Sequence, residues 1–442
     1  MGKYFGTDGV RGIANEKLNA NLAYRIGRYI GYNANKKIKI LVARDTRLSG
    51  RFLADSLCSG IVCSGGDVCN IDVSTTPSVS YIVKKFDFDF GVMISASHNP
   101  YYDNGIKIFN SLGEKLNNEI ELEIEKYIDA KDEYLPFAKN EFIGKYLSGE
   151  EYLNEYINFL KLKSLNINKN IRILIDCANG SASFIAPLLA KELNLNAKII
   201  NNHPNGININ DRCGSTHISN LSTIVKNEHF DVAFAFDGDA DRCLAMDKNG
   251  NVVDGDGIMY LNALSLKKDN KLNNNTVVLT VMSNIGLKKA FERENINIAE
   301  VGVGDKYVQA EMKKHNYSLG GEQSGHIIFL DDMNTGDGVL TMIKILNVIS
   351  TENKDIDELI KDLKIYPQEL KNIIVQNKDA ILSHEGFKNR IKELEKELDG
   401  NGRILVRPSG TEPLIRVMCE AKTIELCSYI CDELINYISE LL

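Results

Sequence analysis

Tryptophan is absent from the sequence, as are Cys-x-x-Cys pairs and uninterrupted apolar runs of about 18 residues. The missing tryptophan points to no function. The missing Cys pairs argue against a structural zinc site, and the odd number of cysteines, nine, argues against a disulfide framework, so we expect reduced thiols in hydrophobic cores. The opening MGKYFGTDGVRG lacks the apolar segment of a signal peptide. We therefore expect a cytoplasmic protein that neither spans nor binds a membrane.

Basic residues are in the minority, because 52 Lys and Arg stand against 60 Asp and Glu, for a formal net charge of -8. This sign is wrong for a protein organised around a nucleic-acid backbone, so no nucleic-acid partner is expected. Hydrophobic residues make up 43% and charged residues 25%, as in ordinary globular proteins. With about 150 residues per domain, 442 residues suffice for about three domains.

Strand-like apolar segments alternate with helix-like segments through most of the chain. In the first block, helix-like spacing over 49–63 follows Ser49, a candidate N-cap, and the loop Ser95–Lys107 follows a buried strand. Two further blocks repeat this rhythm. The segments that we expect to be strands are 38–45, 68–73, 89–95, 171–176, 197–200, 231–236, 276–281 and 296–301. Such alternation predicts parallel or mixed sheets covered by helices.

The last part of the chain has a different order. After 366–368 come one strand, a charged helix over 385–398, a strand pair around RPSGTEP and a terminal amphipathic helix. The expected fold class is α/β, with three tandem α/β domains with mixed sheets plus a smaller C-terminal α+β domain. We place the domains at 1–149, 150–251, 252–365 and 366–442.

Ser97 lies in a loop where ligands gather in open α/β sheets, beyond the carboxyl end of a strand. His98 is its neighbour, and Lys107 closes the same loop. A serine in such a loop is usually a turn residue. A triad hydrolase is a rival reading, but Ser97 is outside any GxSxG motif, and an adjacent histidine is poorly placed as its base. The segment 321–325, GEQSG, also misses that motif by one position.

Three aspartates, Asp237, Asp239 and Asp241, follow the apolar strand at 231–236 in the segment DGDADR. So many carboxylates would repel one another, and a divalent cation is the simplest remedy. An EF-hand starts with this spacing, but Arg242 and Lys248 occupy the positions where that loop needs Gly and Glu. Oxygen ligands alone favour Mg²⁺ shared with a phosphate, while a solvated acidic turn is the alternative.

Two more loops carry residues suited to a phosphorylated sugar. In RPSGTEPLIR, small and hydroxyl residues lie between two arginines and could cradle a phosphate; a plain hairpin is the alternative. The glycine-framed loop 320–326 offers Glu322 and Ser324 to sugar hydroxyls. A hydroxyl nucleophile, a cation, a sugar clamp and a phosphate anchor together describe phosphoryl transfer between serine and a sugar phosphate. Because no Walker A motif is present, we expect a donor other than ATP.

These four motifs, SASHNP, DGDADR, GEQSGH and RPSGTEP, occur in the order found in the α-D-phosphohexomutase superfamily, which the chain resembles over nearly its whole length. The segments YFGTDGVRG, NDRCGSTH (210–217) and GGEQSGHIIFLDDMNTGDG resemble its bacterial members that act on glucosamine phosphates. The resemblance implies an active site in the central cleft. It also implies a swinging C-terminal domain.

The resemblance also implies roles for single residues. Ser97 would be the phosphoserine and share Mg²⁺ with the three aspartates. The other catalytic residues would be Arg11, Lys107 and His98, of which Arg11 and Lys107 would assist proton transfer. The implied substrate-binding residues are Arg242, Glu322, Ser324, Arg407, Ser409, Gly410, Thr411 and Arg416. One departure is Lys306, at a position where relatives often carry Arg. The resemblance therefore does not assign Lys306 a role as a substrate contact, because Lys lacks the bidentate fork of Arg.

By this resemblance the enzyme would interconvert glucosamine 6-phosphate and glucosamine 1-phosphate through a bisphosphate intermediate, feeding UDP-N-acetylglucosamine synthesis. Glucosamine 1,6-bisphosphate or glucose 1,6-bisphosphate would activate it, and it would be a monomer or homodimer. The alternatives are a relative acting on glucose or mannose phosphates, an aspartyl-phosphate mutase using Asp237, and a phosphosugar sensor without turnover. The second leaves Ser97 and RPSGTEP without roles. The intact set of Ser97, Lys107 and carboxylates argues against the third.

Overall fold

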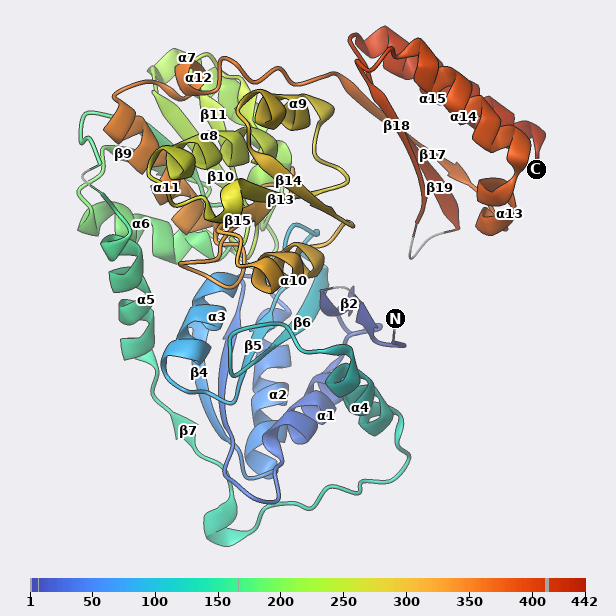
Figure 1. Cartoon of the computed structure of the whole chain (residues 1–442). Coiled ribbons are helices and arrows are strands. Elements are labelled where there is room, and N and C mark those ends of the chain that lie inside the picture. The colour runs from blue at the N-terminus through green and yellow to red at the C-terminus, as the bar shows by residue number, and fades with distance from the viewer. Residues whose placement is uncertain (1, 7, 166, 410–412) are drawn as a thin grey trace. The chain divides into compact units, whose positions relative to one another are not determined.

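The computed structural model describes the chain except residues 1, 7, 166 and 410–412. Its packing divides it into two compact units, Met1–Met282 with Asn297–Ile360 and Ser283–Ile296 with Lys361–Leu442. The described strands form one sheet each of seven, five, four and three strands, all shown in Figure 1. The three larger sheets are covered by helices, and the smallest lies in the C-terminal unit, as the predicted fold class requires.

The seven-stranded sheet is mixed and has the order β1-β2-β6-β5-β3-β4-β7. Neighbours β3, β4 and β5 are parallel, whereas β6 runs antiparallel to β5. Its strands are β1 (Phe5–Gly6), β2 (Gly9–Ile13), β3 (Lys39–Arg44), β4 (Asp67–Val73), β5 (Phe90–Ile94), β6 (Asp103–Asn110) and β7 (Tyr146–Leu147). Residues of α1 (Ala20–Gly31) and α2 (Gly50–Cys63) build one core with the sheet, and residues of α3 (Thr76–Lys85) build a second. The helix α4 (Asn118–Asp129) adds Ile124 to the first core.

The five-stranded sheet has the order β12-β11-β10-β8-β9, with β10 parallel to β8 and antiparallel to β11. Its elements are α5 (Glu150–Leu162), β8 (Ile173–Asp176), α6 (Ala182–Glu192), β9 (Ala197–Ile200), η2 (Ser215–Leu221), α7 (Ser222–Glu228), β10 (Val232–Phe236), β11 (Cys243–Asp247) and β12 (Val252–Val253). Every residue of β10 is buried, which explains its unbroken apolar run VAFAF.

The four-stranded sheet has the order β14-β13-β15-β16. The same part of the chain also contains helices that the alternation of strand-like and helix-like segments did not predict, among them α8 and α11. The elements of this part are α8 (Gly255–Lys268), η3 (Asn273–Asn275), β13 (Thr276–Thr280), β14 (Asn297–Val301), α10 (Asp305–His315), β15 (Leu319–Gly321), β16 (Ile327–Phe329), α11 (Gly338–Glu352) and α12 (Ile356–Leu359). Residues 339–346 of α11 are buried except Lys344, so this helix lacks the amphipathic period that marks a surface helix.

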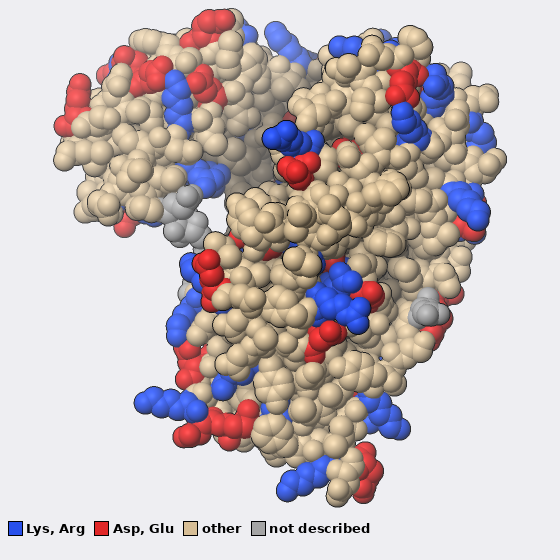
Figure 2. All heavy atoms as spheres, turned by 180° about the vertical axis from the view of Figure 1, so that it is seen from behind, with Lys and Arg blue, Asp and Glu red and all other residues tan. Residues whose placement is uncertain are grey.

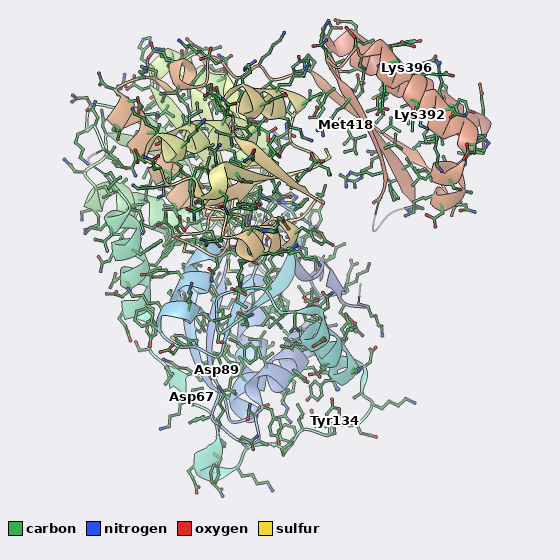
Figure 3. The ribbon with its side chains drawn as sticks, in the orientation of Figure 1. Asp67, Asp89, Tyr134, Lys392, Lys396 and Met418 are labelled. Carbon is green, nitrogen blue, oxygen red and sulfur yellow. The ribbon has the colours of Figure 1, made fainter. Side chains whose placement is uncertain are left out.

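The C-terminal unit has an antiparallel sheet in the order β17-β19-β18. Its elements are α9 (Ile285–Arg293), β17 (Gln368–Ile374), α13 (Lys378–Ser383), α14 (Glu385–Glu397), β18 (Arg403–Pro408), β19 (Leu414–Glu420) and α15 (Ile424–Glu440). Residues of α14 and α15 pack with the sheet in one core. Figure 3 labels the exposed Lys392 and Lys396, one turn apart on α14, and the buried Met418 on β19.

One local prediction was wrong, and a second is confirmed only in part. Lys107 is not a loop residue, because β6 begins at Asp103 and carries it in the sheet opposite Met93; the preceding Asn-Gly hides the alternation IKIF. Ser49 is at the N-cap position of α2 but its side chain makes no capping bond, since its Oγ accepts a hydrogen bond from Asn104 Nδ2.

The prediction for the cysteines is confirmed, since all nine are free thiols and all but Cys63 are buried. In the part of the chain that the structure describes, we find no helix with the length and apolarity needed to cross a membrane. On the face drawn in Figure 2, Lys and Arg lie among Asp and Glu rather than forming one large basic patch.

A buried carboxyl group links α5 to α11. Asp337 caps α11 by accepting a hydrogen bond from Leu340 N, and its other oxygen accepts one from the hydroxyl of buried Tyr156 at 2.8 Å. Burial, which outweighs these hydrogen bonds, raises the pKa of Asp337 to about 6. Its ordinary value is near 3.8, so the folded state favours the neutral acid.

We expect Asp337→Asn to make the protein more stable at neutral pH. The raised pKa means that the stability contributed by the neutral acid is present below about pH 4 and lost as pH rises through 6, by up to roughly 3 kcal/mol for about two pKa units. The amide keeps the cap and never ionises. Thermal unfolding from pH 4 to pH 8 should therefore show equal midpoints at the acid end and a growing advantage for the variant, levelling above pH 7. A constant difference would contradict this.

Candidate active site

Ser97 lies just beyond the carboxyl end of β5, in a backbone conformation unusual for a residue with a side chain. Its φ is 52° and its side chain is 1% exposed. Its N–H donates to Ser95 Oγ at 2.9 Å, and its Oγ donates to Asp237 Oδ2 at 2.5 Å. Asp67 and Asp89, labelled in Figure 3, lie at or just before the opposite, amino ends of β4 and β5. The serine hydroxyl is thus fixed against the carboxylate loop of the neighbouring domain.

The three aspartates of the loop after β10 form one buried cluster. One oxygen from each of Asp237, Asp239 and Asp241 lies within 4.8 Å of the others. The loop approaches the serine closely at Gly238, where a Cβ would lie 2.5 Å from the carbonyl oxygen of Ser97. Only glycine permits this approach. The sequence motif therefore joins two loops as well as supplying carboxylates.

Lys107 is the cation buried against this cluster. Its Nζ donates to Asp239 Oδ2 at 2.8 Å and lies 3.5 Å from Asp241 Oδ2. Burial acts to lower the pKa of Lys107, but Asp239, Asp8 and Asp241 outweigh it and raise that pKa well above its usual value. Asp237 lacks this support, so burial and then its two neighbouring carboxylates raise its pKa well above normal. The cluster thus holds more negative charge than Lys107 balances.

Arg11 on β2 reaches the site through Asp8. The Asp8 carboxylate accepts hydrogen bonds from Arg11 and Lys115, and Lys107 Nζ lies 3.1 Å from its Oδ2. Lys115 also donates to Asp305 on α10 at 2.7 Å. Burial opposes ionisation of Asp8, yet these cations hold its pKa below the usual range. Asp8 thus places the two cations, Arg11 and Lys107, beside each other.

Two histidines flank the cluster in different charge states. Burial, followed by Arg242 and Arg11, lowers the pKa of His98 to about 4, and its Nδ1 lies 3.4 Å from Ser97 Oγ. Burial also acts to lower the pKa of His326, but Asp241 and Asp305 raise it to about 9. At neutral pH, His98 is uncharged beside the serine and His326 is a cation facing Asp241.

The sugar-loop candidates come from a turn that closes on the aspartate loop. Glu322 Oε1 accepts from Gly304 N at 3.2 Å, and Gly325 O accepts from Cys243 N at 3.0 Å. Ser324 is exposed at the tip of this turn. Burial lowers the pKa of Arg242, but Asp237 and then Asp241 outweigh it and raise that pKa. These residues lie in the same compact unit as Ser97.

The phosphate-anchor candidates lie in the C-terminal unit. Arg407 on β18 is directly opposite Arg416 on β19 in the antiparallel register. Burial and then Arg416 lower the pKa of Arg407. Like charges directly opposite each other destabilise a strand pair, so this pairing favours a bound anion. Ser409 is buried nearby, while Gly410 and Thr411 lie outside the described residues.

Comparison with known proteins agrees with this arrangement. Family models for phosphoglucomutase/phosphomannomutase match 2–135 (alpha/beta/alpha domain I), 150–250 (domain II), 254–366 (domain III) and 370–436 (C-terminal domain). The chain belongs to the phosphoglucomutase/phosphomannomutase family.

Relatives within this family are similar over the whole chain. The phosphoglucosamine mutase of Bacillus subtilis is 47% identical over 100% of this chain and 98% of its own, and that of Bacillus licheniformis is 48% identical over 97% and 96%. A phosphoglucomutase/phosphomannomutase family protein from Burkholderia thailandensis shares the fold with a TM-score of 0.79 at 23% identity, covering 97% of this chain and 95% of its own. The Aspergillus fumigatus N-acetylphosphoglucosamine mutase, solved with GlcNAc-6P and magnesium, has a TM-score of 0.70 at 17% identity, covering 98% and 95%.

Within this family fold, the structure brings together the sequence-predicted residues of the first unit. Reasoning from sequence missed Asp8, Thr76 and His326. Thr76 Oγ1 donates to Asp239 Oδ2, and Thr76 N donates to Asp239 O at 3.0 Å. The available signals were the polar turn after β4 for Thr76, and for Asp8 and His326 their places inside the motifs TDGVRG and GEQSGH.

The aspartate cluster fits a hard divalent cation. Asp239 Oδ1 is buried and makes no hydrogen bond with the described residues, and the cations nearest to buried Asp241 Oδ1, His326 Nδ1 and Arg242 Nε, lie 3.7 and 3.9 Å away, beyond hydrogen-bond distance. Buried carboxylate oxygens without donors are costly unless a cation compensates them. With the Ser97 Oγ beside Asp237, the donor set is entirely oxygen, which suits Mg²⁺. Ser97, Asp237, Asp239 and Asp241 are the residues that could hold it.

We expect Asp241→Asn and Asp239→Asn each to weaken Mg²⁺ binding at least tenfold, about 1.4 kcal/mol or more, measured by isothermal titration calorimetry. Asp247→Asn is the matched control. Asp247 is also a buried carboxylate at an end of β11, but it accepts bonds from Asn249 and Asn251 in the turn. Asp239→Asn protein that binds the metal as tightly as the parent would rule out the cluster as the site.

Proposed function

We propose that this chain is a phosphoglucosamine mutase that interconverts glucosamine 6-phosphate and glucosamine 1-phosphate through phosphorylated Ser97. The observation that carries the proposal is the buried Ser97 hydroxyl, 2.5 Å from a carboxylate of the three-aspartate cluster, with Lys107 on the cluster's other side. The full-length identity of 47% to a phosphoglucosamine mutase supports glucosamine over glucose or mannose phosphates. In this role the protein would supply UDP-N-acetylglucosamine synthesis.

The reaction balances without ATP. The bond between phosphorus and Ser97 Oγ breaks as phosphorus bonds to one hydroxyl oxygen of the sugar phosphate; that hydroxyl loses its proton, and Ser97 Oγ takes one up. The resulting bisphosphate turns around, and its other phosphoryl group is transferred to Ser97 Oγ, which loses its proton while the sugar oxygen gains one. The enzyme ends phosphorylated, as it began.

The chain's own residues divide these tasks. Lys107 and Arg11, held beside each other by Asp8, would assist this proton transfer by stabilising negative charge on the reacting sugar oxygen. Neutral His98, 3.4 Å from Ser97 Oγ, would offer a hydrogen bond at the transferred group. Arg242, Glu322 and Ser324 would orient the sugar. The tight hold on Ser97 would fix the angle of attack.

The proposal includes Mg²⁺ on Asp237, Asp239 and Asp241 with an oxygen of phospho-Ser97. When bound, the cation would neutralise charge on the phosphoryl group as it transfers. Glucosamine 1,6-bisphosphate or glucose 1,6-bisphosphate would load Ser97 and so activate the enzyme. We also propose a cytoplasmic location, because sugar phosphates are charged and do not cross membranes unaided. A monomer or homodimer remains our prediction for the oligomeric state.

We expect Ser97→Ala to abolish nearly all mutase turnover without unfolding the protein, because it removes the buried hydroxyl that donates to Asp237. The measurement is turnover of glucosamine 6-phosphate, with glucose 6-phosphate and mannose 6-phosphate on the same preparation, and phosphopeptide mass spectrometry of the parent. Ser80→Ala is the control, since the hydroxyl of this buried serine of the same domain donates to Gly113 O. Phosphate found on another residue, with an active Ser97→Ala variant, would disprove the assignment.

Arg407 should contribute binding rather than bond-making. A charge-assisted contact is worth roughly 1.5 to 3 kcal/mol, so Arg407→Ala should lower kcat/KM by about tenfold to somewhat over a hundredfold. Some fall in kcat is expected, because distant binding energy helps to align the reacting end. Arg390→Ala, which removes an ion pair with Glu433 in the same unit, is the control. Unchanged kinetics for Arg407→Ala would mean that the anchor lies elsewhere.

A further inference from the structure

Arg47 is a fully buried guanidinium that the catalytic proposal does not use. Its side chain is 1% exposed, and it follows β3 in the segment Asp45–Arg47. Its Nε donates to Asp45 Oδ2 at 2.8 Å, while Nη1 donates to the carbonyls of Pro100 and Asp103. Its Nη2 donates to the carbonyls of Ser97 and Asn99 at 2.9 and 2.8 Å. All five N–H donors of the guanidinium are therefore used, four of them on the serine loop.

The same pair also holds the other backbone group of Ser97. Asp45 Oδ2 accepts from Ser95 Oγ at 2.7 Å, and Ser95 Oγ in turn accepts from Ser97 N at 2.9 Å. The N–H and the carbonyl of Ser97 are thus both tied to the Asp45–Arg47 pair. That matters because Ser97 has a left-handed backbone, which a residue with a side chain keeps only when its surroundings impose it.

A second donor reaches the same two carbonyls from the neighbouring domain. Asn210 Nδ2 donates to Ser97 O at 2.9 Å and to Asn99 O at 3.1 Å. Asn210 opens the segment 210–217, which the sequence singles out and the reaction leaves without a role. Its own N–H donates to Ala178 O at 2.9 Å, which holds it in its domain.

We propose that Arg47 and Asn210 are positioning residues that hold the Ser97 loop from two domains and so set the direction of Ser97 Oγ for phosphoryl transfer. Neither is proposed to touch the substrate; both act through the carbonyls of Ser97 and Asn99. The inference rests on the proposed function. It predicts that replacing either residue lowers kcat even where the variant still folds, because a small misplacement of the nucleophile slows the transfer step.

The test compares Arg47→Lys with Arg28→Lys. Arg28 is equally buried in the same domain and also donates to backbone carbonyls, those of Leu135 and Pro136, and to Ser64 Oγ; among the described residues it makes no hydrogen bond to the serine loop. Lysine keeps the charge but cannot fork to five acceptors. Both variants should unfold at a lower temperature. Only Arg47→Lys should lower kcat, by about ten- to a hundredfold, with KM within about threefold.

Hydrogen exchange gives a readout that needs no turnover. Amide protection of the peptide 95–104 should fall in Arg47→Lys and stay at the parent's level in Arg28→Lys. If Arg47→Lys does not fold, Asn210→Ala decides, since it removes two donors without a buried charge and should lower kcat in the same direction by a smaller factor.

Kcat within twofold of the parent in Arg47→Lys, or in Asn210→Ala if that variant is needed, would overturn the inference and leave these residues a structural role. An inactive parent with all three hexose 6-phosphates would instead overturn the proposed function. In that case, exchange of the 95–104 peptide still shows whether Arg47 holds the loop, and unchanged protection overturns the inference as well.

Discussion

The burial of Lys107 among carboxylates is the interaction on which the rest of the site depends. An ammonium and three acidic groups removed from water are tolerable only if they lie close together, and Asp8, Asp239 and Asp241 surround Lys107 for this reason. Because Lys107 and Asp8 come from one domain and the other two aspartates from the next, the charges hold the two domains in register. The same contacts place Ser97 Oγ against Asp237.

The charge in this cluster is unbalanced in a way that suits its chemistry. Asp241 has a lowered pKa because Lys107 and His326 overcome its burial, whereas Asp237 has a raised pKa because burial and its acidic neighbours act together. A divalent cation and a phosphoryl group would complete the balance. The site is therefore prepared for a doubly charged cation and an anion arriving together.

Close approach of backbone is a second constraint. The serine loop and the aspartate loop meet at Gly238, and the serine loop is held on its carbonyl side by Arg47 and Asn210. The guanidinium of Arg47 and the side-chain amide of Asn210 hold the loops together by hydrogen bonds to backbone carbonyls. Residues that contact the backbone of the serine loop would thereby control the geometry of the reacting oxygen.

The sequence by itself determined the fold class, the order of the strands around each motif and the identity of the chemical groups. Apolar runs that stop at polar loops are a local signal, and the four motifs lie in such loops. It did not determine that Lys107 belongs to a strand, that Asp8 and His326 border the aspartates, or that Arg47 uses four of its five donors on the serine loop. Some of these contacts are between residues more than 200 positions apart in the sequence, such as Asp8 and Asp241, which both lie on Lys107. Only the tertiary packing within and between domains, which decides which buried charge meets which partner, could supply them.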